Sequence, residues 1–348
     1  MKTAARLIPL LLTLACGAGI TQEAKLQLPP GPVAQSGKHV VFIAADYKNG
    51  GVMGAYRGFE EAAKKLGWRI QLKDGGGSKA VQATQLAFAL GARPDGIVIG
   101  GFDPGDFSGE MAQAKKARIA LVGWHAAKEP GPTGELFANI STRPLDVAQL
   151  AADFVIQDAK RKGRTVGVVI FNDRQFAVAN AKTAAMKQSI EACRNYRGCK
   201  VLAVEDIAIS DVATRIPPVV SRLVATHGAS WTYSLAINDI YFDEINYPLI
   251  AAQRTDIVNV SAGDGSNKAL GRIAAGLAQQ AATVAEPLRL QGFQLADELN
   301  RAFAGSPPSG FEAKPILVTT ESLKKVDQGG IEAKLGFEAA YSAIWGTQ

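Results

Sequence analysis

The sequence predicts an α/β protein made of two doubly wound lobes, each built on a mostly parallel sheet. Short apolar runs alternate regularly with amphipathic segments, and this cycle occurs twice along the chain. Consecutive parallel strands need crossover connections, so the alternation favours parallel sheets covered by helices on both faces. With 348 residues, 47% of them hydrophobic, the chain is long enough to bury two cores.

The first cycle begins at residue 39 with the apolar run HVVFIAAD. The segment after it is amphipathic: Met53, Tyr56, Phe59 and Leu66 recur near helical spacing, and Gly67 ends the helix. Continuing in the same way, we expect strands at 39–46, 68–74, 95–102 and 118–125, and helices at 50–67, 80–92 and 107–117.

The second cycle predicts helices at 146–163, 177–193, 212–228, 241–253 and 267–276, the third of them interrupted by prolines. Strands are expected at 165–172, 199–207, 231–239, 256–266 and 281–287, followed by a helix at 290–305 and a strand at 314–320. Ligands of such folds bind outside the carboxyl ends of the strands, so the cleft between the lobes is the expected site.

The first residues have the pattern of an export signal. Lys2 and Arg6 precede an apolar run at 7–15 and small residues at 16–18, which predicts a signal peptide over 1–18. Residues 19–37 then read as a spacer with a stiff Pro-Pro-Gly-Pro tether. The run Thr13-Leu-Ala-Cys16 also loosely resembles a lipobox, so a lipid anchor on Cys16 stays open beside simple secretion.

Charge and cysteine content restrict the partners. The net charge of +6 is modest and its Lys and Arg are scattered, which does not indicate a nucleic-acid partner. Cys193 and Cys199 are separated by five residues at a helix-to-strand turn, which favours a structural disulfide over a zinc site. Because the three His are scattered, we expect no metal and no other cofactor.

Several segments together resemble the type I periplasmic solute-binding proteins of the ribose/galactose kind, which serve ABC importers. The likeness spans 38–320 and depends on VFIAAD, GAYRGFEEAAKKLGW, RPDGIVIGGFDP, YSLAINDI, NVSAGDGS and ATVAEPLRLQGFQLADEL. It implies a periplasmic, monomeric receptor that closes on a small molecule and docks an inner-membrane ABC permease. It also implies a hinge near 139–142, 285–287 and 317–320, a first lobe of 38–139 plus 288–316, and a second lobe of 140–286 plus 317–348.

Family pocket positions map well onto the second lobe. Asn238 and Asp264 match residues that hydrogen-bond sugar hydroxyls, and Glu286 stands where sugar receptors often have Gln. Asn180 falls near a position often occupied by Arg.

The first lobe departs from the family. The aromatic pair that sandwiches a pyranose would fall near Gly51 and Val52, and the Asp-Arg pair that ends the fourth strand is replaced by Trp124 and His125. With Phe102, Val52 and Met53 nearby, the expected first-lobe wall is apolar. The resemblance thus predicts a ligand that is lipid-, sterol- or aromatic-like with one polar end, and an ordinary sugar or polyol remains the alternative.

Other interpretations stay open at this point. Trp124 could pack in the lobe core instead of lining the cleft, and His125 could be a ligand donor or a partly exposed loop residue. Asp264 and Glu286 could form a hydrolytic carboxylate pair, but no nucleophile motif accompanies them, so we expect no enzyme. The closed form could also engage a histidine-kinase ectodomain instead of an importer.

Overall fold

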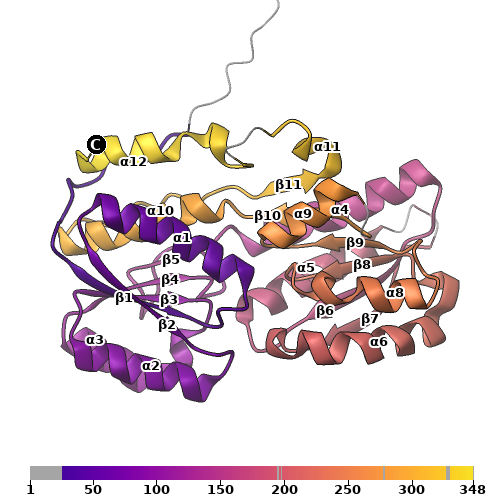
Figure 1. The fold of residues 1–348 in the computed structure, drawn as a ribbon, viewed down its shortest axis with the longest axis horizontal. Coiled ribbons are helices and arrows are strands. Elements are labelled where there is room, and N and C mark those ends of the chain that lie inside the picture. Colours follow the sequence, from indigo (N-terminus) through magenta and orange to yellow (C-terminus); the bar gives the residue numbers. More distant parts are fainter. Residues whose placement is uncertain (1–25, 194–195, 197, 277–278, 327–329, 348) are drawn as a thin grey trace, which may run out of the picture.

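The computed structural model describes residues 26–347 except 194–195, 197, 277–278 and 327–329. It shows two α/β lobes lying side by side, which confirms the predicted fold class (Figure 1). The predicted signal peptide and Cys16 lie outside the described residues. Within them, no helix is both long and apolar enough to cross a membrane.

The first sheet has five parallel strands in the order β2-β1-β3-β4-β5. The strands are β1 (His39–Ala44), β2 (Arg69–Asp74), β3 (Gly96–Gly100), β4 (Ala120–Trp124) and β5 (Ala138–Ile140). Side chains of a strand alternate between the two faces. Val40 and Phe42 of β1 therefore join one core, while Val41 and Ile43 join the other.

Helices cover both faces of this sheet. The helices α1 (Gly50–Lys65) and α10 (Leu288–Phe303) pack on one face, and α2 (Lys79–Ala92) and α3 (Ser108–Lys116) on the other (Figure 1). Right-handed crossovers explain this split, because the chain leaves β1 toward β2 and then reverses direction across the sheet. A short 3₁₀ turn, η1 (Pro104–Phe107), leads into α3.

The second sheet has the order β11-β10-β9-β8-β6-β7, and only β10 and β11 are antiparallel. Its strands are β6 (Gly167–Asn172), β7 (Lys200–Asp206), β8 (Tyr233–Ala236), β9 (Val258–Ser261), β10 (Gln280–Ala285) and β11 (Ile316–Thr319). The helices associated with it are α4 (Pro144–Lys162), α5 (Ala177–Ala192), α6 (Val212–His227), α7 (Tyr241–Glu244), α8 (Asn246–Ala251), α9 (Asn267–Ala275) and α11 (Thr320–Leu323). Short 3₁₀ turns occur at η2 (Ile209–Asp211), η3 (Gly228–Ser230) and η4 (Ala333–Leu335).

Two details of the second lobe differ from the prediction. The helix α6 runs unbroken through Pro217 and Pro218. Each proline removes one backbone hydrogen bond, but the buried face of α6, with Ile216 and Val220, packs in the lobe core and keeps the helix intact. The single helix expected at 241–253 is instead the pair α7 and α8.

The chain crosses between the lobes four times, once more than predicted. It passes from β5 to α4, from β10 to α10, from α10 to β11, and from α11 back to a last helix, α12 (Phe337–Trp345). The third crossing follows Ala313, which is still buried in the first-lobe core, so it precedes β11 and does not lie at 317–320.

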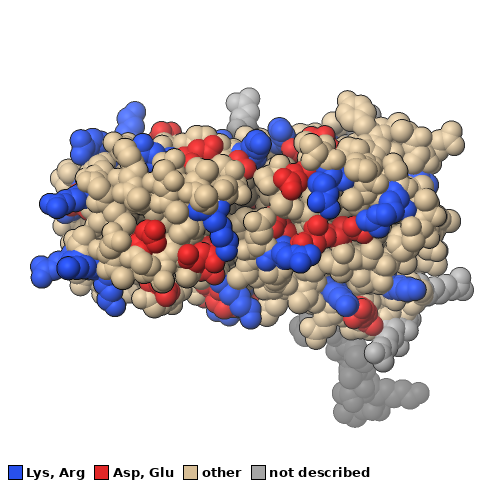
Figure 2. Space-filling model, turned by 90° about the horizontal axis from the view of Figure 1, so that it is seen from below, with Lys and Arg blue, Asp and Glu red and all other residues tan. Residues whose placement is uncertain are grey.

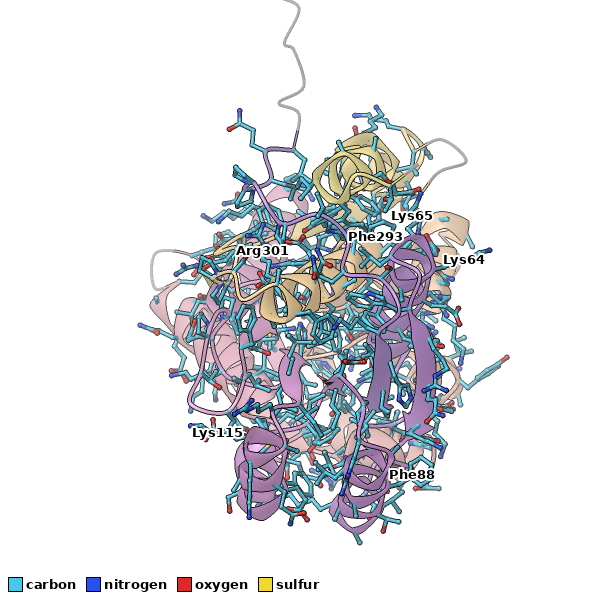
Figure 3. All side chains as sticks on the ribbon, turned by 90° about the vertical axis from the view of Figure 1, so that its left-hand side faces the viewer. Lys64, Lys65, Phe88, Lys115, Phe293 and Arg301 are labelled. Atoms are coloured by element: carbon cyan, nitrogen blue, oxygen red, sulfur yellow. A yellow bond between two sulfur atoms is a disulfide. The ribbon has the colours of Figure 1, made fainter. Side chains whose placement is uncertain are left out.

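The helix α12 belongs to the first lobe, although residues 317–348 were predicted to lie in the second. Its three aromatic side chains recur every four residues and pack on Phe293 of α10, which lies beneath α12 (Figure 3). The indole N–H of Trp345 donates to Asp297 Oδ1 at 2.8 Å. An apolar helical face of this kind must be buried, and α10 offers the matching surface.

The end of the predicted spacer is also part of the first lobe. Leu26 and Leu28 pack against its core, and the amide of Ala34 donates to the Trp345 carbonyl at 2.9 Å. The Arg301 guanidinium donates to the carbonyls of Pro29 and Pro30 at 3.2 and 2.9 Å. From residue 26 onward the segment is thus docked structure and not a free tether.

The disulfide prediction is confirmed. Cys193 after α5 and Cys199 before β7 are joined, with their Cα atoms 5.8 Å apart. Seen from below, acidic and basic side chains are interspersed over both lobes, in line with the scattered charge of the sequence (Figure 2).

Candidate functional site

A cavity of about 40 Å³ lies between the lobes at the carboxyl ends of their strands. The first lobe contributes the end of β4, the turn after β3 and the residue before α1. The second lobe contributes the start of α5, the 3₁₀ turn η2 after β7, the turn after β8 and the turn after β9. The lining residues are Asn49, Gly101, Trp124, His125, Phe176, Val178, Ala179, Lys182, Ile209, Ile237, Asn238 and Asp264.

Asn238 and Asp264 form the polar pair of the second lobe. The amide Nδ2 of Asn238 donates to Asp264 Oδ2. The turn that presents Asp264 is fixed by Asp239, whose Oδ2 accepts from the backbone amides of Asp264, Gly265 and Ser266 at 3.0, 2.8 and 3.0 Å. Burial raises the pKa of Asp264 to about 6, although the nearby ammonium of Lys182 opposes this.

Glu286 lies behind the cavity, where β10 crosses to α10, and its carboxylate joins both lobes. His125 Nε2 of the first lobe is 2.8 Å from Glu286 Oε2, and Lys182 Nζ of the second lobe is 3.3 Å from Oε1. Gln291 Nε2 and the Thr142 amide also donate to Oε2, at 3.0 and 3.3 Å. Burial alone would raise the pKa of Glu286, but His125 and Lys182 hold it well below its usual range.

Trp124 and His125 stack on each other, with ring centroids 3.9 Å apart and planes nearly parallel. The indole N–H of Trp124 donates to Gln291 Oε1 at 2.7 Å, and the ring is 1% exposed within the first-lobe core. His125 has a φ of +49°, a left-handed conformation that few residues other than glycine adopt. Trp124 therefore belongs to the core and also borders the cavity.

Besides Glu286, four predicted ligand residues do not line this cavity. Phe102 is buried against Phe107 in the core beneath α2 and α3. Val52 is fully buried in the α1 side of the first-lobe core, and Met53 packs at the edge of that core. The reason is the same for all three: their side chains fill the lobe that presents them, so they offer no apolar wall to the cleft.

Asn180 is the fourth of these predicted ligand residues outside the cavity. It is exposed on α5, where its Oδ1 accepts from Asn172 and its Nδ2 donates to the Arg174 carbonyl. A helix turns 100° per residue, so Val178 and Lys182 reach the cavity on the opposite side of α5. The apolar surface of the cavity comes mainly from the second lobe, through Phe176, Val178, Ile209 and Ile237.

Sequence reasoning missed Lys182, which is 2% exposed. Its position gave a usable signal, because it falls on the stripe of α5 that also contains Val178, Met186 and Ile190. A lysine on the buried stripe of an amphipathic helix is almost always paired. Its partner Glu286 is 104 residues away, which no local pattern reveals.

The donor atoms of His125, Asp264 and Glu286 lie within 4.8 Å of one another, as a metal site would require. The surroundings do not suit a cation. Lys182 is bonded to Glu286 and already brings a positive charge to this place, so a metal ion would be repelled. We assign no metal to these residues.

The family model described as a periplasmic binding protein domain matches residues 40–307. A comparison with curated proteins gives no match.

Solved structures share the fold at low identity. The myo-inositol binding protein of Caulobacter, bound to myo-inositol, is similar with a TM-score of 0.71 and 18% identity over 86% of this chain and 98% of that one. An ABC transporter solute-binding protein of Agrobacterium vitis with bound allitol gives 0.69 and 18%, over 83% and 97%. The 5-methylthioribose transporter solute-binding protein of Thermotoga lettingae gives 0.72 and 15%, over 87% and 93%.

Proposed function

The chain belongs to the periplasmic binding protein family, and from this premise we propose that it closes its inter-lobe cleft on a small hydroxylated solute, a sugar or polyol, and delivers it to an ABC permease. The observation that supports this most directly is the Asn238–Asp264 pair on the cavity wall. An amide and a carboxylate side by side can donate to and accept from the same hydroxyl groups.

The rest of the cavity supports the same class of ligand. Its apolar side chains suit the C–H faces of a polyol, and its polar groups lie together at one end. The lipid-, sterol- or aromatic-like ligand predicted from the sequence loses its support, because Phe102, Val52 and Met53 pack inside the first lobe. The ligands named for the similar structures, myo-inositol, allitol and 5-methylthioribose, are polyhydroxylated.

Binding requires the lobes to part and close again. The present cavity of about 40 Å³ is far smaller than the ~300–1,000 Å³ of typical ligand sites, so any sugar needs a wider cleft. The crossing segments lie at the ends of helices and strands, where a few residues can absorb such a hinge motion.

We propose no catalytic role. A glycosidase needs one carboxyl group able to donate a proton and a second able to act as base or nucleophile. Glu286 is engaged by His125, Lys182 and Gln291, and so it is not available for either task. Export through the signal peptide of residues 1–18, and hence a periplasmic location, belong to the same proposal.

The test is a binding survey of the purified mature chain. Calorimetry and thermal unfolding with glycerol, myo-inositol, allitol, ribose and glucose should identify at least one ligand, and small-angle scattering should show compaction on binding. Asn238→Ala should weaken that ligand at least tenfold, while Asn246→Ala, outside the cavity, should leave its affinity unchanged. If no polyol, sugar or amino derivative of them binds, the proposal is wrong.

A further inference from the structure

We propose that the solute carries an ammonium group that pairs with Asp264, so that the receptor selects amino sugars or amino polyols over their neutral counterparts. This inference rests on the proposed function and narrows its ligand class. It follows from the charges around the cavity and from the partners that each buried charge has.

Among the described residues, five titratable side chains gather here: Asp239, Asp264 and Glu286 against Lys182 and His125. Three carboxylates thus face one ammonium and one imidazole. Even with His125 protonated, these five groups together keep one net negative charge. Buried charges are costly unless they are paired and hydrogen-bonded. The partners of each carboxylate therefore show which of the three is least compensated.

Two of the three carboxylates have ion-pair or hydrogen-bond partners within the protein for both of their oxygens. Glu286 takes both cationic groups, with His125 at 2.8 Å and Lys182 at 3.3 Å, and accepts two further hydrogen bonds. Asp239 accepts three backbone amides through Oδ2, and its Oδ1 accepts from Gln280 Nε2 at 2.8 Å. Neither of these carboxylates needs a ligand.

Asp264 is the exception. It is 3% exposed, it lines the cavity, and its carboxylate accepts a hydrogen bond from one neutral group in the described structure, the Asn238 amide. The positive end of α1 is close, since a Cβ on Gly51 would lie 2.3 Å from Asp264 Oδ2. However, the amides of Gly51 and Val52 donate to Asn49 Oδ1 and not to Asp264.

The electrostatic consequence is visible in Asp264 itself. Burial, helped by the charge of Glu286 and opposed by Lys182 and His125, raises its pKa to about 6. A ligand ammonium at Oδ1 or Oδ2 would supply the missing charge and form a charge-assisted hydrogen bond, which is roughly twice as strong as a neutral one. A carboxylate or phosphate ligand would add to the excess negative charge instead.

The experiment compares ligands that differ only in this charge. Glycerol is paired with serinol, in which an ammonium replaces the central hydroxyl, and glucose is paired with glucosamine, with N-acetylglucosamine as a neutral amide control. Calorimetry of the wild-type chain near pH 7 should give at least tenfold tighter binding for the amine of at least one pair. This preference for the amine over its neutral counterpart should be lost in Asp264→Asn. It should persist in Asp153→Asn, which changes an exposed aspartate on α4.

A second measurement needs only the wild-type chain. The amine-to-neutral affinity ratio should fall as the pH drops from about 7 to about 5, because Asp264 becomes protonated and loses the charge that the ammonium pairs with. Tighter or equal binding of the neutral member in every pair overturns the inference and leaves the proposed function standing. Failure of all ligands, neutral and amine, instead counts against the proposed function.

Discussion

The buried ion pair between Lys182 and Glu286 should make Lys182→Met strongly destabilising. Both side chains are almost fully buried, at 2% and 1% exposure, and their charged atoms are 3.3 Å apart. Removing one partner of such a pair leaves a buried charge uncompensated and costs about 3–5 kcal/mol. Because Glu286 keeps His125, Gln291 and the Thr142 amide, we expect the lower end, about 3 kcal/mol.

The assay is chemical unfolding with a control on the same helix. Lys187 of α5 pairs with Glu191 at 3.9 Å on the surface, so Lys187→Met should change the free energy of unfolding by less than about 0.5 kcal/mol. Adding Glu286→Gln to Lys182→Met removes the stranded charge and should recover at least half of the loss. The reasoning is refuted if Lys182→Met unfolds at the same denaturant concentration as Lys187→Met, or if the double variant is no more stable than the single one.

Three further predictions concern other parts of the molecule. Asp264→Asn should raise the unfolding midpoint at pH 7. This advantage should shrink as the pH falls through about 6 and be lost by about pH 4, because an acid whose pKa is raised by folding destabilises the folded chain in full above its folded pKa and not at all below its unfolded pKa; equal shifts at pH 7 and pH 4 would contradict this. Trp345→Ala should cost about 3–5 kcal/mol in urea unfolding, through lost ring packing and the lost bond to Asp297, and a loss below about 1 kcal/mol would show that α12 is not docked as described. Replacing Cys193 and Cys199 by Ser should lower the free energy of unfolding by about 2 kcal/mol, since the closed loop is short, and wild type treated with a reductant should then match the variant.

The order of strands and helices could be predicted because it is a local property. Apolar runs such as HVVFIAAD define their strands whatever they pack against, and all but one of the strands follow from such runs. The exception is β5, whose three residues are too few for a pattern. No element was predicted for the segment that forms α12, and which lobe buries its aromatic side chains depends on α10, so this information is not local.

The candidate site could be predicted in part for the same reason. Trp124, His125, Asn238 and Asp264 lie at or shortly after strand ends, which the fold class brings together, and the structure places all four at the cavity. Side chains one or two positions away cannot be assigned in this way.

Phe102 illustrates the limit. It stands directly after Gly101, which lines the cavity, yet its ring points into the core beneath α2 and α3. The direction is set by the backbone of Gly101, whose φ of +92° is one that only glycine adopts readily. A shift of one residue therefore decides between a ligand contact and a core contact.

The docking of residues 26–36 against α12 has a practical consequence for measuring motion. Ala34 is bonded to Trp345, so both ends of the described chain are attached to the same rigid body. Two fluorophores attached at the two ends of the described chain would both move with the first lobe. Energy transfer between them would change very little when the lobes move. A working sensor needs one fluorophore on a terminus and the other inserted on the opposite lobe, for example beside the exposed Tyr247 of α8.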